Sequence, residues 1–231
     1  MQISCKGDCF SNERRGADGM KINDNVYRLD SSNGSYVYLI RGKEMMLVDT
    51  GFPLKGKSIR KEIEALGIQL KDIKHILLTH HDIDHIGNAA MLQKLTGATV
   101  WASKEDIPYI RGEVDRHSFK KYFKYIFRGR APENMKPYGA DENNIGGIEV
   151  IPTPGHTPGH VCLLYKGALF AGDLLESKDG KLRSYPAAWN WDNSLMAESI
   201  RKIAGLSCQW VCPAHGKPVI SVSPGYLRNW L

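Results

Sequence analysis

The sequence predicts an α/β fold in which helices cover β-sheets. Short strand patterns joined by turn residues come first, strands then alternate with amphipathic helices, and a second strand-rich half ends with a helix and a strand. Such alternation indicates an α/β sandwich. A chain of 231 residues with 42% hydrophobic composition has the size of one domain, and we interpret residues 1–231 as one.

The first half contains short strands followed by strand and helix in alternation. Short, largely apolar runs bounded by turn residues predict the strands 26–29, 36–40, 45–48, 75–78 and 99–102. Apolar residues at helical spacing predict helices over 57–66 and 88–95. Gly67 and Gly97 follow these helices, where a left-handed residue usually ends a helix.

The second half returns to strands, expected at 148–152, 161–165, 169–171 and 210–212, with a helix over 194–206. Residues 104–144 lie between the two halves and are less regular, which suggests a lid or an insertion. Within them, residues 116–128 place aromatic side chains at helical spacing beside basic ones. We interpret this segment as a docked amphipathic helix that could roof a pocket.

Composition limits the classes of function. The net charge of +6 comes from 31 basic and 25 acidic residues, spread too evenly to predict nucleic-acid binding. No stretch approaches the roughly 18 apolar residues of a membrane span. We expect a cytoplasmic protein that acts on a small molecule and binds neither nucleic acid nor membrane, and the sequence leaves a homodimer open.

Five cysteines at low density favour a reducing compartment. Two pairs with the same spacing could hold a structural zinc or form disulfides, namely Cys5, Cys9, Cys208 and Cys212. The sequence does not show that the two ends of the chain meet, so small buried thiols are the preferred interpretation.

The strongest chemical signal lies in residues 78–87, Leu-Thr-His-His-Asp-Ile-Asp-His-Ile-Gly, directly after an expected buried strand. Its metal-competent side chains are His80, His81, Asp82, Asp84 and His85. Zinc, iron and manganese all accept imidazole and carboxylate ligands. A solvated polar turn or a helix cap would not need three histidines, so we interpret the segment as a metal site.

Three later segments each place a histidine or aspartate where an apolar strand ends. They are Pro-Gly-His-Thr-Pro-Gly-His with His156 and His160, Ala-Gly-Asp with Asp173, and Pro-Ala-His-Gly with His215. Glycines beside these residues permit the close approach that a crowded site needs. Each segment alone could be an ordinary turn, but their shared character predicts that they complete the same site.

With these motifs the chain resembles the metallo-β-lactamase superfamily, including its glyoxalase II and lactonase-like branches. The family's first motif matches Val48-Asp49-Thr50-Gly51, its histidine-rich motif matches residues 80–85, and its later ligands follow in the expected order. The resemblance covers nearly the whole chain. It implies a four-layered αβ/βα sandwich with two metal ions at one edge, between the sheets.

The resemblance also implies which residues bind the metals. A first position would be held by His80, Asp82 and His156. A second would be held by Asp84, His85 and His215. Asp173 would bridge the two ions, Asp49 would orient ligands from outside, and His160 would form a hydrogen bond near the site.

One departure from the family pattern H-x-H-x-D-H concerns Asp82, which replaces the second histidine. His81 could restore the histidine only through a shift of register, which the divergence of neighbouring side chains disfavours. A third carboxylate makes the inner site one charge less positive. Oxygen ligation also moves the preference from zinc toward iron or manganese, so we predict mixed or non-zinc metal.

The function implied is a dinuclear-metal hydrolase of an ester, thioester or lactone. A metal-bound hydroxide would attack the carbonyl, with Asp84 orienting this nucleophile or accepting its proton. A di-iron redox enzyme, either a sulfur dioxygenase or an oxygen-reducing enzyme, gains weight from the carboxylates. A β-lactamase is disfavoured, because those enzymes are usually exported and residues 1–6 do not resemble the start of a signal peptide.

The aromatic stretch 183–192 lies close in sequence to Asp173. From it we predict Tyr185 and Trp189 as substrate contacts, because aromatic side chains commonly line small-molecule pockets. Ordinary packing under the start of a helix explains the stretch equally well. The motifs do not identify the substrate.

Overall fold

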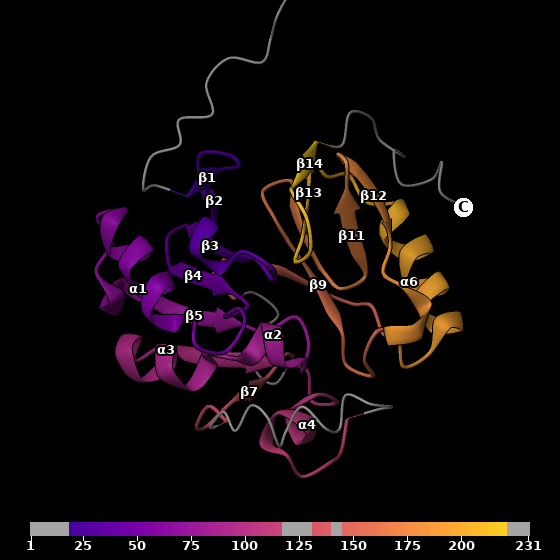
Figure 1. The fold of residues 1–231 in the computed structure, drawn as a ribbon, viewed down its shortest axis with the longest axis horizontal. Coiled ribbons are helices and arrows are strands. Elements are labelled where there is room, and N and C mark those ends of the chain that lie inside the picture. Colours follow the sequence, from indigo (N-terminus) through magenta and orange to yellow (C-terminus); the bar gives the residue numbers. More distant parts are fainter. Residues whose placement is uncertain (1–18, 117–130, 140–144, 221–231) are drawn as a thin grey trace, which may run out of the picture.

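A computed structural model describes residues 19–116, 131–139 and 145–220. Two large sheets lie face to face, with α1 (Gly56–Ala65) and α3 (Ala89–Thr96) outside one and α6 (Asn193–Ala204) outside the other (Figure 1). The order of layers is therefore helix, sheet, sheet, helix. The predicted α/β sandwich is confirmed.

The first sheet has seven strands in chain order. They are β1 (Met20–Lys21), β2 (Val26–Leu29), β3 (Val37–Arg41), β4 (Met45–Val48), β5 (Ile73–Leu77), β6 (Thr99–Ala102) and β7 (Lys136–Pro137). Pairing is antiparallel from β1 to β4 and parallel from β4 to β7. Parallel neighbours need crossover connections, and α1 and α3 lie in two of them.

The second sheet has the strand order β14-β13-β10-β9-β8. Its strands are β8 (Glu149–Pro152), β9 (Val161–Tyr165), β10 (Ala168–Gly172), β13 (Trp210–Pro213) and β14 (Val219–Ile220). The connection from β10 to its parallel neighbour β13 contains α6 and a hairpin, β11 (Leu175–Lys178) with β12 (Lys181–Ser184). The same alternation of strand and helix thus builds both halves.

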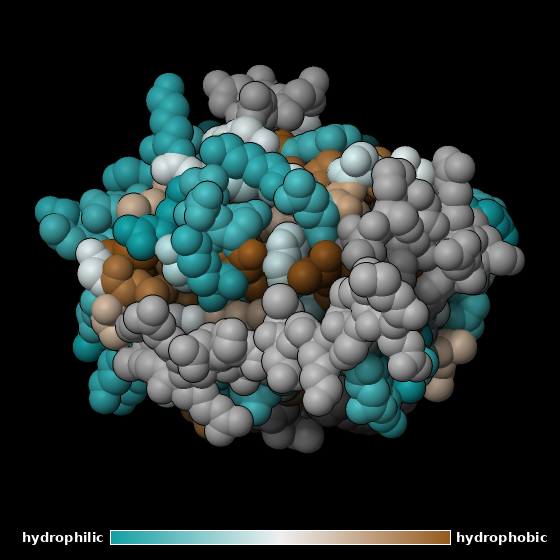
Figure 2. Space-filling view, turned by 90° about the horizontal axis from the view of Figure 1, so that it is seen from above, coloured by the Kyte–Doolittle hydropathy of each residue, from teal (hydrophilic) through white to brown (hydrophobic). Residues whose placement is uncertain are grey.

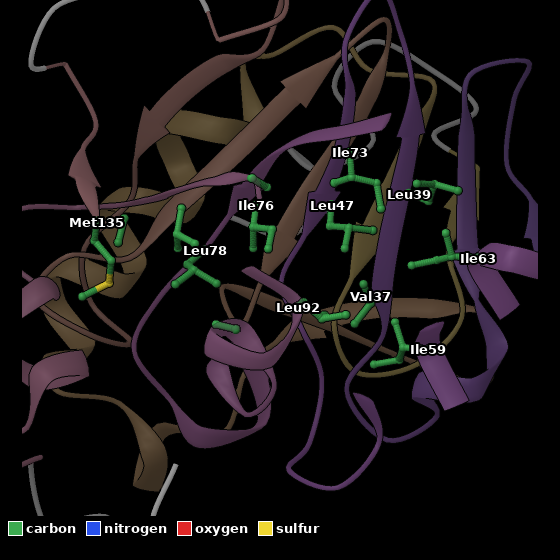
Figure 3. Close-up of a cluster of buried hydrophobic side chains, with 14 of the residues drawn as sticks. Val37, Leu39, Leu47, Ile59, Ile63, Ile73, Ile76, Leu78, Leu92 and Met135 are labelled. Carbon is green, nitrogen blue, oxygen red and sulfur yellow. The ribbon is translucent and has the colours of Figure 1, made fainter. Parts of the chain in front are cut away.

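Three hydrophobic clusters separate the four layers. The first packs Ile59 and Ile63 of α1 and Leu92 of α3 against the first sheet (Figure 3). The second fills the space between the sheets, where the rings of Tyr38 and Phe170 lie 5.3 Å apart. The third joins the second sheet to α6. Each sheet is buried on both faces, which explains its nearly continuous apolar strands.

The predicted elements agree with the structure to within two residues, and the shorter elements were missed. Besides the hairpin and the edge strands β1, β7 and β14, the missed elements are α2 (Ile83–Ile86), α4 (Ile107–Arg111) and the 3-10 helices η1 (Asp30–Ser32), η2 (Leu70–Asp72) and η4 (Ala187–Trp189). Both α4 and β7 lie within residues 104–144, so part of that stretch belongs to the sandwich. A lid made by its remainder stays a prediction.

Other predictions fall outside the described residues. The amphipathic helix expected over 116–128 lies there apart from Arg116, as do Cys5 and Cys9. Cys212 is buried in the core between the sheets. None of the helices in the described ranges is long and apolar enough to cross a membrane.

Hydrophilic residues cover much of the described surface in the view of Figure 2, with small hydrophobic areas between them. Small areas of this kind are normal on folded proteins. The cytoplasmic location, the lack of nucleic-acid binding and the oligomeric state remain predictions.

Candidate metal centre

The polar residues singled out in the sequence gather where strands of both sheets end. Residues 79–82 follow β5 and lead into α2, while Asp49 follows β4. From the second sheet, His156 follows β8, Asp173 follows β10 and His215 follows β13. Hydrogen bonding within the sheets therefore fixes where the loop that carries each polar residue begins.

The first group of side chains comprises His80, Asp82, His156 and Asp173, all buried, with one ligand atom of each within 4.8 Å of the others. The Nε2 atom of His156 lies 3.1 Å from Oδ2 of Asp82, and that of His80 lies 3.8 Å from the same oxygen. Two imidazoles and two carboxylates at this spacing can surround one cation.

A second group lies beside the first and comprises Asp84, His85 and His215, whose ligand atoms are also within 4.8 Å of one another. Oδ2 of Asp84 is 3.2 Å from Nε2 of His215 and 3.6 Å from Nε2 of His85. This group can hold a second cation.

Asp173 faces both groups with different oxygens. Its Oδ1 lies 3.2 Å from Nε2 of His85 and 3.3 Å from Nε2 of His215. Its Oδ2 lies 3.5 Å from Nε2 of His156 and 3.9 Å from Nε2 of His80. One carboxylate can therefore bind an ion of each group at once.

The polar atoms at the centre of the site fit a pair of divalent cations. The buried Nε2 atom of His80 has no hydrogen-bond partner among the described residues. A buried polar atom without a partner costs about 1–3 kcal/mol, and metal binding would remove this cost. Imidazole and carboxylate together suit zinc, iron and manganese.

The pKa shifts of the histidines in the protein without metal also indicate a site for cations. Burial would lower the pKa of His215, but Asp173 and Asp84 outweigh it and raise the pKa to about 10. Burial also opposes the raised pKa of His85, again outweighed by Asp173 and Asp84. The carboxylates thus hold protons on imidazoles, which metal ions would displace.

Sequence comparison agrees with this geometry. The family model described as "Metallo-beta-lactamase superfamily" matches residues 32–215. The chain belongs to the metallo-β-lactamase superfamily.

Curated relatives of this superfamily member are distant. An uncharacterized protein of Bacillus subtilis, YobT, is 30% identical over 196 residues, which cover 78% of this chain and 82% of that protein. The hydroxyacylglutathione hydrolase of Rhodospirillum rubrum is 29% identical over 189 residues, covering 80% of this chain and 62% of that one.

A solved structure agrees with the fold. The subclass B3 metallo-β-lactamase BJP-1 of Bradyrhizobium japonicum superposes with a TM-score of 0.70, covering 92% of this chain and 90% of that one at 22% identity. At that identity the likeness shows the fold alone, and it confirms the sandwich of this superfamily.

The second ring nitrogen of three histidines in this metallo-β-lactamase-type site is also engaged. Nδ1 of His85 donates to Asp49 at 2.8 Å, and Nδ1 of His156 donates to the amide oxygen of Asn190 at 3.0 Å. Nδ1 of His80 lies 3.1 Å from the Thr79 hydroxyl. These contacts turn each Nε2 toward the centre of the site.

Asp49 lies outside both groups, as the family pattern implied. Its carboxylate accepts hydrogen bonds from the backbone and the hydroxyl of Thr79, both at 2.8 Å, as well as from His85. Its φ of 60° is unusual for a residue other than glycine. Such strain at a polar residue is common where a functional site needs one fixed orientation.

His160 belongs to neither group and forms hydrogen bonds behind the site. Its Nε2 accepts from the backbone N–H of Asp173 at 3.1 Å, so its Nδ1 carries the hydrogen and donates to Thr153 at 2.9 Å. Burial, with the nearby His156, lowers the pKa of His160 to about 3. The ring is therefore neutral and supports the backbone of Asp173.

Asp82, and not His81, lies in the first group. The His81 ring stacks on Tyr109 with ring centroids 4.4 Å apart, and its Nδ1 lies 3.0 Å from Asp106. The shift of register that would have brought His81 inward is absent from the described residues around the site. In the folded chain, an aspartate therefore occupies the place where the family pattern has a histidine.

The two predicted substrate contacts differ in position. The Tyr185 ring lies 4.9 Å from that of His156 and 5.4 Å from that of His215, so it covers both groups. Burial and the neighbouring Asp173 raise the pKa of Tyr185, which keeps its hydroxyl protonated. Trp189 is 39% exposed and lines a small pocket beside His156, together with Tyr109 and Trp191.

Sequence reasoning missed Asn190 and Asp106. Asn190 lies in the aromatic stretch, but its distance in sequence from His156 does not predict the hydrogen bond between the two side chains. Asp106 lies in the irregular stretch after β6, where a single aspartate next to a glutamate reads as surface charge. Only the folded chain places either residue at the site.

Proposed function

We propose that the protein is a dinuclear metal-dependent hydrolase of an ester, thioester or lactone. Homology makes the chain a metallo-hydrolase, since relatives such as YqjP and YflN of Bacillus subtilis carry the name "probable metallo-hydrolase". Homology does not identify the substrate, so the choice of an ester, thioester or lactone is our proposal.

The observation that carries the proposal is the position of Asp173 between the two groups. Its Oδ1 is closest to histidines of the second group and its Oδ2 to histidines of the first. A carboxylate so placed supports two ions that act on the same substrate.

The proposed metal ligands are the side chains of the two groups: His80, Asp82, His156 and Asp173 for the first ion, and Asp84, His85 and His215, again with Asp173, for the second. When bound there, the ions would supply Lewis acidity and lower the pKa of bound water. Asp84, whose Oδ2 faces His215, is placed to accept a proton from the attacking water. The protonated hydroxyl of Tyr185, above both groups, is placed to donate a hydrogen bond to the substrate's carbonyl oxygen.

The relatives favour an ester-like substrate. A hydroxyacylglutathione hydrolase, by its name, acts on a thioester, and it aligns with most of this chain. The small pocket beside His156 is bordered by Trp189, Trp191, Tyr109 and Pro158. Such walls suit an apolar part of the substrate next to the reacting carbonyl.

A second candidate is a di-iron redox enzyme, and Asp82 favours it. Its carboxylate makes the first group richer in oxygen ligands than the family pattern, which suits iron. The same residue leads us to propose iron or manganese, rather than zinc alone, for the hydrolase.

The test is elemental analysis of the protein expressed with zinc, iron and manganese all supplied, together with a panel of thioester, lactone, phosphodiester and β-lactam substrates. We expect two metal ions per chain, not both zinc, and turnover of a thioester or lactone. Oxygen consumption with an added persulfide or electron donor, without ester turnover, would instead establish the redox enzyme.

An Asp82→His variant is the matched control for metal identity. It restores the imidazole of the family pattern, so its metal content should shift toward zinc. Two zinc ions in both proteins would contradict the proposed role of Asp82 in metal preference, and no bound metal would contradict the whole proposal.

A further inference from the structure

Asp106 is a carboxylate with no exposed surface, between β6 and α4. Its Oδ2 accepts hydrogen bonds from the backbone N–H of His81 and from the Thr157 hydroxyl, both at 2.9 Å. Its Oδ1 accepts from the backbone N–H of Gly159 at 2.8 Å. A buried charge is tolerated only when donors of this kind satisfy it.

The donors belong to the two loops that carry the first metal group. His81 lies between His80 and Asp82, and Thr157 directly follows His156. His80, Asp82 and His156 are therefore each next in sequence to a residue that donates a hydrogen bond to Asp106. Asp173 is the one member of the first group that is not. One carboxylate thus connects a loop of the first sheet to a loop of the second.

Gly159 shows that the loop is shaped around this carboxylate. A Cβ atom on Gly159 would lie 2.7 Å from Oδ1 of Asp106 and 1.9 Å from the Ser103 hydroxyl oxygen. Ser103 in turn accepts a hydrogen bond from the backbone N–H of Asp106 at 3.1 Å. Any side chain at position 159 would push the carboxylate away from the loop.

The second group has a comparable support in Asp49. That carboxylate accepts from Thr79 and from Nδ1 of His85, a residue of the second group. Asp49 reaches His80 of the first group only through the Thr79 hydroxyl. Asp106 instead contacts His81, Thr157 and Gly159, in the loops that carry the first group. Asp49 therefore contacts a residue of the second group directly, whereas Asp106 contacts sequence neighbours of the first group.

We propose that Asp106 is a positioning residue for the first metal position, which it holds ready by fixing the loops of His80, Asp82 and His156. The inference rests on the proposed dinuclear centre. It predicts that Asp106 affects the affinity of one position and not of the other. A buried carboxylate that only stabilised the fold would not separate the two positions.

The test measures zinc affinity, by competition with a chromophoric chelator, in proteins that retain one position each. The double variant His85→Ala/His215→Ala leaves the first position, and His80→Ala/His156→Ala leaves the second, because each removes both histidines of the other position. In the protein that keeps the first position, adding Asp106→Asn should weaken zinc binding by about 10- to 100-fold, the usual effect of losing an outer partner. In the protein that keeps the second position, it should change the affinity by less than about twofold.

Two further variants keep the test decisive. Thr157→Val removes one donor at nearly constant volume, so it should weaken the first position less than Asp106→Asn does, and it serves if Asp106→Asn fails to fold. Glu62→Gln is the matched control, because the Glu62 carboxylate is also buried and accepts from the backbone of Asp30 and Ser31, away from both groups. It should lower thermal stability without changing zinc affinity.

The outcomes separate this inference from the proposed function. Equal losses at both positions, or unchanged affinity in Asp106→Asn and Thr157→Val, would overturn the role of Asp106 while the metal centre stands. If neither single-position protein nor the parent binds zinc, iron or manganese, the dinuclear centre fails and the inference fails with it.

Discussion

At the scale of single residues, the site depends on where each polar atom points. Nε2 atoms of four histidines face three aspartates, and the second nitrogens of His80, His85 and His156 are held by other side chains. Orientation of this kind before metal arrives lowers the cost of binding.

Two ligand substitutions test the catalytic part directly. His156→Ala and Asp173→Ala should each reduce turnover to background, because the first removes a ligand of one position and the second removes the carboxylate shared by both. Far-ultraviolet circular dichroism of both variants should stay close to the parent, since the three hydrophobic clusters are untouched. Full hydrolysis by both variants would disprove their role.

His160 predicts an effect of pH on stability. Its pKa is about 3 in the folded protein against 6.5 for an ordinary histidine, so the unfolded chain takes up a proton first as the pH falls. The stability it contributes is therefore present above pH 6.5 and is lost as the pH falls toward 3, by up to about 1.4 kcal/mol per pH unit.

The measurement is urea unfolding between pH 7 and pH 4 with a chelator present. His160→Gln, which can still accept from Asp173 and donate to Thr153, should show a shallower loss of stability on acidification than the parent. Parallel curves for the two proteins would mean that His160 does not titrate as its burial requires.

The sequence predicted the members of both groups because their chemistry is visible in short motifs. Asp82 could be placed from its spacing, since alternate residues of an extended segment point the same way. Asp106 could not be, because the groups that contact it come from two loops far away in the sequence and include two backbone N–H groups, which leave no pattern of residue types.

At the scale of secondary structure, long apolar strands were predictable and short polar elements were not. The bounds of β2, β4, β6 and β9 match the prediction, since apolar residues predominate in them. The hairpin of β11 and β12 was missed because Glu176 and Lys178 make it polar. Its pairing depends on register with the rest of the chain, which local sequence does not encode.

The loop of residues 185–191 is the element that we expect to set substrate preference. It is fastened to the ligand loop by the hydrogen bond from the Trp191 backbone to the carbonyl of His156, at 3.1 Å. Trp189→Ala should raise KM for substrates with a bulky apolar group by roughly tenfold, because it removes one wall of the pocket, with kcat nearly unchanged.

The comparison that isolates this effect is a pair of thioesters or lactones that differ only in the size of that group. KM for the small substrate should change little in Trp189→Ala. An equal rise in KM for both substrates would mean that the side chain shapes the loop rather than contacts the substrate.

At the scale of the whole molecule, the two groups of candidate metal ligands combine side chains from both halves of the sandwich. His80, Asp82, Asp84 and His85 follow a strand of the first sheet, whereas His156, Asp173 and His215 follow strands of the second. Metal ions bound by both sets would cross-link the sheets at one edge. The apolar layer between the sheets, which includes Tyr38 and Phe170, holds the halves together without them.

Metal removal should therefore lower stability without unfolding the protein. Each ion present at about 100 times its dissociation constant contributes about 2.7 kcal/mol, or about 5.4 kcal/mol for two, so treatment with a chelator should lower Tm by about 10–20 °C. Differential scanning calorimetry with and without chelator measures the shift, and adding metal back should reverse it. An unchanged Tm would argue that the ions do not bridge the halves.

Anomalous diffraction from crystals of the metal-loaded protein tests the central claim most directly. The account predicts two peaks on either side of the Asp173 carboxylate, one contacted by His80, Asp82 and His156 and the other by Asp84, His85 and His215. A single peak away from Asp173, or metal bound only at other residues, would contradict it.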